Sequence, residues 1–100
     1  MPSLNWEQVR QRYPDGTMVP HMTGKRMFEV LRVADDAVHF KWAVVEDGTV
    51  SRANLERAVE LLEEGVLLAD PASLTSDYRT LVSDERPTIA VALLKDLGFW

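Results

Sequence analysis

The chain has 100 residues, of which 46% are hydrophobic and 27% charged, and its formal net charge is −5. This composition is that of an ordinary globular protein, and it excludes bulk disorder. A chain of this length fits a single domain, 1–100. The absence of cysteine excludes a disulfide framework, a cysteine-ligated zinc site and a thiol nucleophile.

The sequence carries no visible targeting or membrane segment. Its first residues, MPSLNWEQVR, lack the basic segment and the apolar run of a secretory signal. No apolar stretch approaches the roughly 20 residues that are needed to span a bilayer. We therefore expect a cytoplasmic protein that does not bind a membrane.

The negative charge lies entirely in the second half of the chain. Residues 1–24 and residues 25–52 each sum to zero, with two basic residues against two acidic and five against five. Residues 53–100 carry four basic residues against nine acidic, which gives the net −5. Because nucleic-acid binding depends on clustered lysine and arginine, any phosphate contact would come from the first half.

Residues 5–13, NWEQVRQRY, have the pattern of a short helix capped by Asn5. Three apolar residues fall on one stripe at helical spacing: Trp6, Val9 and Tyr13. Pro14 ends this helix, and a loop is expected over 14–25. So short a helix must dock on the rest of the fold to be stable.

A three-stranded antiparallel meander is predicted next, with strands at about 26–34, 37–45 and 49–51. Asp35-Asp36 forms the first turn in this prediction. Asp47-Gly48 forms the second turn, because both residue types tolerate positive φ.

The alternating segment AVHFKWAVV, 37–45, fixes which side of the meander is expected to face the core. With a two- or four-residue first turn, the predicted core face carries Met27, Glu29, Leu31, Val33, Val38, Phe40, Trp42 and Val44. The predicted outer face carries Phe28, Val30, Arg32, His39, Lys41 and Ala43. A three-residue loop would instead shift the pairing by one and turn Phe28 and Val30 to the core face.

Two longer helices complete the expected fold. Ser51 caps a helix at about 52–64 that ends at Gly65, and a C-terminal helix is predicted at about 87–97. Between them we expect a strand or extended run over 66–69, a short helix from Asp70 through Leu74 and an irregular stretch over 76–86. The sequence thus predicts an α+β fold in which the 52–64 helix packs across the core face of the meander and the C-terminal helix completes the core.

The outer face of the 26–45 hairpin is the candidate surface for nucleic acid. Its candidate contacts are Lys25, Arg26, Arg32, His39 and Lys41. Single-strand binders combine such charges with exposed aromatic side chains, and here only Phe28 is expected outside. A solvated face whose charges discourage edge pairing is the simpler interpretation, so nucleic-acid binding is the alternative hypothesis.

No catalytic or metal-binding pattern is evident. Gly24-Lys25 lacks the preceding glycine and the following serine or threonine of a phosphate-binding loop. His21 and His39 are the only histidines, and neither has a second ligand nearby in sequence. A Ser-His-Asp set would have to be assembled in space. We therefore expect a non-enzymatic protein with no cofactor and no metal.

Two features of the second half favour a protein partner. Acidic residues follow the 52–64 helix to its C-terminus, where the helix dipole disfavours them: Glu60, Glu63 and Glu64. The C-terminal helix is more apolar than one buried stripe requires, and its surplus includes Leu94, Leu97, Phe99 and Trp100. We predict an adaptor, regulator or inhibitor that binds another protein, or a second copy of itself as a homodimer, through these residues.

Overall fold

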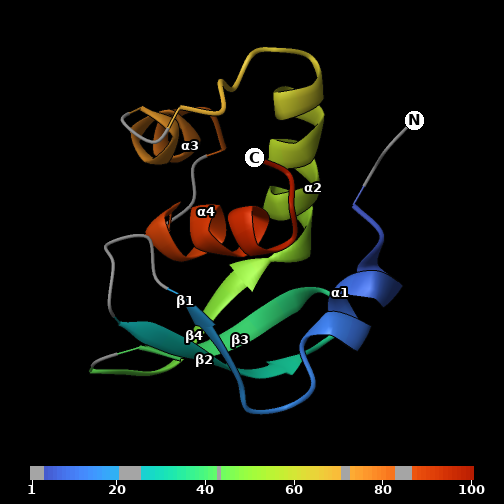
Figure 1. Ribbon diagram of the computed structural model, residues 1–100, viewed down its shortest axis with the longest axis vertical. Coiled ribbons are helices and arrows are strands. Elements are labelled where there is room, and N and C mark those ends of the chain that lie inside the picture. Colours follow the sequence, from blue (N-terminus) through green and yellow to red (C-terminus); the bar gives the residue numbers. More distant parts are fainter. Residues whose placement is uncertain (1–3, 21–25, 43, 71–72, 83–86) are drawn as a thin grey trace.

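The computed structural model contains four helices and one four-stranded antiparallel sheet within the residues that it describes, 4–20, 26–42, 44–70, 73–82 and 87–100 (Figure 1). The elements are, in order, α1(Trp6–Arg12), β1(Thr17–Pro20), β2(Met27–Val33), β3(Ala37–Trp42), β4(Val45–Ser51), α2(Arg52–Glu63), α3(Leu74–Val82) and α4(Pro87–Asp96). The strands pair in chain order, β1-β2-β3-β4. The predicted α+β class is confirmed, with one strand more than expected.

The long helices all lie on one side of the sheet. Figure 1 shows α4 lying across the sheet, with α2 and α3 beyond it on the same side. Seven of the ten residues of α4 are buried: Pro87, Ile89, Ala90, Val91, Ala92, Leu93 and Leu94. The helix expected across the sheet was α2, and this detail is wrong because α2 extends away from the end of β4. The surplus apolarity of α4 is explained by its central position between the sheet and α3.

The short helix α1 docks as its stripe predicts. Asn5 caps it by accepting hydrogen bonds from the backbone amides of Glu7 and Gln8. Trp6 is buried, and its Nε1 donates to the carbonyl oxygen of Ala34 over 2.8 Å. This contact ties α1 to the turn between β2 and β3.

The predicted register of β2 on β3 is correct near the turn and wrong farther from it. Val33 pairs with Val38 as predicted, but Val30 lies opposite Phe40, and an irregularity between Val30 and Arg32 leaves Leu31 as an extra residue. A bulge of this kind reverses the facing of every residue before it. Phe28 and Val30, expected outside, are therefore fully buried.

Strand β1 lies in the segment that was expected to be a loop. It pairs with β2, so that Val19 is opposite Phe28 and is buried. Pro20 is compatible with this edge strand because an edge residue needs no amide hydrogen on its outer side. A strand of four residues that ends in proline gives too weak a pattern to be recognised from sequence.

The predicted turn at Asp47-Gly48 is also wrong, because both residues lie within β4. Gly48 is opposite Phe40, and a Cβ built on it would lie 2.7 and 2.9 Å from the Cε1 and Cε2 atoms of the Phe40 ring. The glycine is therefore required by the packing of an aromatic ring against the backbone of β4. The chain instead reverses between Trp42 and Val45, which are paired.

The connection from α2 to α4 contains a helix that the sequence analysis missed. Residues 66–69 form no strand, and α3 occupies most of the stretch that was expected to be irregular. Its three buried residues repeat at a spacing of four: Leu74, Tyr78 and Val82. Of the short helix predicted from Asp70 through Leu74, residues 71–72 lie outside the described residues.

Candidate interaction surface

The face of the sheet opposite α4, called the outer face below, is the candidate site. Two cross-strand rows build it, one through Met18, Glu29 and Lys41 and one through Arg32, His39 and Thr49. Figure 1 shows no labelled helix on this side of the sheet. An antiparallel sheet can leave one face to solvent, and such a face is normally polar.

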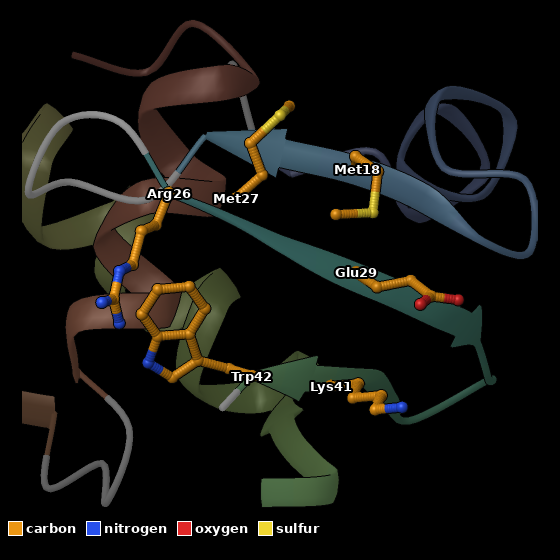
Figure 2. Close-up of a pocket in the computed structure, with 6 residues that line it drawn as sticks. All are labelled: Met18, Arg26, Met27, Glu29, Lys41 and Trp42. Carbon is orange, nitrogen blue, oxygen red and sulfur yellow. The ribbon is translucent and has the colours of Figure 1, made fainter. Parts of the chain in front are cut away.

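The outer face has a shallow hollow of about 350 Å³, and part of the lining of this hollow is apolar. The hollow is lined by Met18, Arg26, Met27, Glu29, Lys41 and Trp42 (Figure 2). Met18 and Met27 are 49% and 46% exposed, and Trp42 is half-buried against the core. The hollow thus combines accessible thioether groups with the side of an indole ring.

Four residues of the predicted core face lie on this side of the sheet or in solvent instead. Met27 and Glu29 were expected inside and are turned outward by the bulge at Leu31. Val44, also expected inside, is 93% exposed at the reversal between β3 and β4. Trp42 was expected in the core but is half-buried at the rim of the hollow. The pairing of β3 with β4 has a second irregularity just before it, between Phe40 and Trp42.

The charged side chains of the hollow have no ion-pair partner among the residues that the structure describes: Arg26, Glu29 and Lys41. Figure 2 shows the Arg26 guanidinium directed toward Trp42, while Glu29 and Lys41 point to the other end of the hollow. Two cations against one carboxylate leave the hollow with a sum of one positive charge. Lys25, which was predicted to add to this charge, lies outside the described residues.

The second row of the outer face is internally paired. Asp47 Oδ1 lies 2.9 Å from His39 Nδ1, and Asp47 Oδ2 lies 3.4 Å from an Arg32 guanidinium nitrogen. The hydrogen bond from His39, assisted by the charge of Arg32, lowers the pKa of Asp47 below its ordinary value. This pairing reduces the positive charge that Arg32 and His39 could offer to a phosphate.

The aromatic residue expected on the outer face is absent from it. Phe28 is fully buried and packs edge-to-face against Phe40, with ring centroids 6.2 Å apart. The predicted nucleic-acid surface therefore brings together Arg26, Arg32, His39 and Lys41 on one face, but without the exposed ring on which a base would stack.

The apolar residues predicted to bind a protein are held at the C-terminal end of the core. Leu94 is fully buried, so the prediction that it contacts a partner is wrong for this fold. Leu97, Phe99 and Trp100 are half-buried and pack against the core. The Trp100 Nε1 donates to the carbonyl oxygen of Val91 over 3.0 Å, which folds the chain end back onto α4.

The three predicted acidic contacts are exposed at the C-terminal end of α2, where Glu64 is the C-cap: Glu60, Glu63 and Glu64. Glu60 lies 3.5 Å from Arg57 in a solvent-exposed ion pair, while Glu63 and Glu64 form no ion pair within the part of the chain that is described. These acids lie far along α2 from its start at the sheet, so they form a second surface that is separate from the outer face (Figure 1).

A polar cluster around the buried Tyr13 joins α1 to α4. The Tyr13 hydroxyl donates to Asp96 Oδ2 over 2.6 Å, and Arg12 Nε lies 3.0 Å from the same oxygen. Burial, followed by the hydrogen bond to Asp96, raises the pKa of Tyr13 above its ordinary value of 10.0. The cluster holds the two helices together.

Tyr13 predicts how stability changes at alkaline pH. Because its pKa is raised on folding, its contribution to the free energy of unfolding is complete below about pH 10 and is lost as the pH rises further. Tyr13→Phe is expected to be less stable by about 1.5–3 kcal/mol at neutral pH, since it loses a hydrogen bond to a carboxylate. Urea unfolding from about pH 9 to about pH 11 should show a steeper decline for the wild type than for the variant. Parallel declines would contradict the role given to Tyr13.

Two further features are absent from the described residues. No group of three or more histidine, aspartate or glutamate side chains is placed to hold a metal ion there. No helix among them is long and apolar enough to cross a membrane.

The fold and the site thus define a small α+β domain with one helix-covered and one open sheet face. Comparison with models of protein families, with curated proteins and with solved structures finds no match to the chain.

Proposed function

We propose that the protein is a small non-enzymatic interaction module that binds another protein through the outer face of its sheet. The observation that carries this proposal is the pair of accessible methionines, Met18 and Met27, beside Trp42 in an open hollow. Unbranched thioether side chains adapt their shape to a partner and are used repeatedly at protein-binding surfaces. The apolar surface of this hollow would be removed from water when a partner covers it.

The charges of the hollow indicate what kind of partner fits. Arg26 and Lys41 outnumber Glu29, and the first two lack ion-pair partners within the described residues. A partner that places an apolar side chain between the methionines and carboxylates beside these cations would satisfy both features. Complementary charge of this kind contributes mainly to specificity and to the rate of association.

Nucleic acid is the less supported occupant. Binding of a single strand without sequence preference relies on bases stacked on exposed aromatic rings and on a positive groove along the backbone. The outer face has only half-buried Trp42 among its described aromatic residues, and Asp47 accompanies Arg32 and His39. The basic residues of this face remain the contacts of the alternative hypothesis, and the test below includes it.

We expect acidic substitutions in the hollow to weaken the capture of a partner strongly. Immobilised wild-type protein and the Met18→Asp/Met27→Asp double variant are compared in nuclease-treated lysate, and captured proteins are identified by mass spectrometry. The matched control is Leu81→Asp on α3, because Leu81 is 46% exposed, as Met27 is. We expect the control to retain the wild-type partner and the double variant to lose at least about tenfold in affinity, which corresponds to about 1.4 kcal/mol.

Two results would contradict this proposal. One is a partner that the double variant, still folded by circular dichroism, captures as well as the wild type does. The other is direct binding of purified protein to single-stranded or duplex oligonucleotides that weakens steeply as salt is raised. That second result would instead support the hypothesis that the outer face binds nucleic acid.

A further inference from the structure

The C-terminal end of α2 and the residues after it form an exposed acidic corner. It consists of Glu60, Glu63, Glu64, Val66 and Leu68. No basic residue lies in the last turn of α2, so the negative end of the helix dipole adds to the charge of the carboxylates. The corner therefore concentrates negative potential at one tip of the molecule.

Two apolar side chains project from this acidic corner. Val66 is 50% exposed and Leu68 is 59% exposed, while Leu67 between them is buried. Leu67 anchors the segment to the core, and its two neighbours are left in solvent. Large apolar side chains beside clustered charge are typical of surfaces that contact another protein.

The acidic corner and the hollow have complementary chemistry. The corner offers Val66 and Leu68, and the hollow offers the methionines and Trp42. Glu60 is paired with Arg57, which leaves two negative charges, Glu63 and Glu64, to face the single excess positive charge of the hollow. The hollow fits a partner surface that places apolar side chains beside carboxylates. The acidic corner of this same chain is a surface of that kind.

The two surfaces lie at opposite ends of the molecule. Figure 1 places the end of α2 at the top of the longest axis, with the sheet at the bottom and α4 between them. A single copy cannot bring its own corner to its own hollow. Contact between unlike surfaces of two copies is heterologous, and it extends into chains or closes into rings.

We infer that the acidic corner of one copy docks into the hollow of a second copy, so that the protein associates head to tail. This inference rests on the proposed function, because it names one occupant of the outer face. Each surface is small, so we expect a dissociation constant of roughly 0.1–1 mM for this contact. A partner that binds the hollow more tightly would displace the second copy. Self-association would then be regulated by competition for the same face.

Blocked variants test this contact by sedimentation velocity and light scattering. The hollow variant is Met18→Asp/Met27→Asp, and the corner variant is Val66→Asp/Leu68→Asp. We expect the weight-average mass of the wild type to rise with concentration, to about twice the monomer mass near the dissociation constant, and to fall as salt is added. Each folded variant alone should remain monomeric, and Leu81→Asp should behave as the wild type does.

Mixing the two variants gives the sharpest result. The intact corner of the hollow variant can dock into the intact hollow of the corner variant, whereas the other contact is blocked on both sides. The mixture should therefore form a one-to-one complex and nothing larger. A wild type that stays monomeric up to about 1 mM, or a mixture that forms no such complex, would overturn the inference. Neither result bears on capture of a different protein, which the lysate experiment decides separately.

Discussion

Replacement of Leu94 by alanine is expected to lower the free energy of unfolding by about 3 kcal/mol, within the range of about 2–5 kcal/mol for buried leucines. Leu94 is fully buried in α4, which lies between the sheet and α3, so the truncation would leave a cavity that its neighbours fill only in part. Urea denaturation followed by tryptophan fluorescence and by circular dichroism would measure the change.

Leu81→Ala is the matched control for this substitution. Leu81 is the same residue type, lies in a helix and is 46% exposed, so its truncation should change stability by less than about 0.5 kcal/mol. If Leu94→Ala were as mild as Leu81→Ala, α4 would not be central. Leu94 would then return to the role of a partner contact that the sequence predicted for it.

Gly48→Ala is expected to lower the free energy of unfolding by about 1–3 kcal/mol. The added Cβ would overlap the ring of Phe40, which is itself fully buried and held edge-to-face by Phe28. The ring cannot move aside without disturbing the core. The same denaturation experiment applies, with Thr49→Ala as an exposed substitution in the same strand for comparison.

A double-mutant cycle identifies the cause of this loss. Phe40→Leu removes the ring atoms that the new Cβ would meet, so Gly48→Ala should be less destabilising in that background than in the wild type. We expect the two substitutions to be non-additive by about 1 kcal/mol. Strict additivity would show that Gly48 is required for a reason other than the packing of Phe40.

The features that sequence analysis placed correctly are those decided by local chemistry. Asn5 and Ser51 cap their helices through hydrogen bonds to backbone amides two or three residues away, and Gly65 has a φ of 76° just after α2. These interactions depend on neighbours in the chain and are therefore visible in the sequence. The pairing of Val33 with Val38 beside the turn is local in the same sense.

The features that were missed are decided by long-range packing. Val30 and Leu31 are both apolar and adjacent, so either could face the core, and the bulge that selects Val30 is visible only once β2 is paired with β3. The apolar surplus of α4 fitted either a central helix or a partner surface. Which one applies depends on where the sheet and α3 lie, and sequence periodicity does not give that.

The hollow could not be predicted because the sequence analysis missed strand β1 and assigned the wrong register to β2. Met18 lies on β1, which was expected to be a loop, and Met27 was assigned to the core face until the bulge turned it outward. The sequence of β1 is only the four residues Thr17–Pro20, TMVP. It is too short to predict a strand without a partner strand in view.

The most direct test of the outer face as the binding surface is methyl NMR of methionine and leucine side chains during titration with the captured protein. We expect the Met18 and Met27 methyl resonances to shift or broaden in proportion to the bound fraction, while the Leu81 methyl resonances on the far side of the molecule stay unchanged. Unchanged methionine resonances at saturation, with shifts at Leu81 instead, would contradict it and move the binding surface to the helical side.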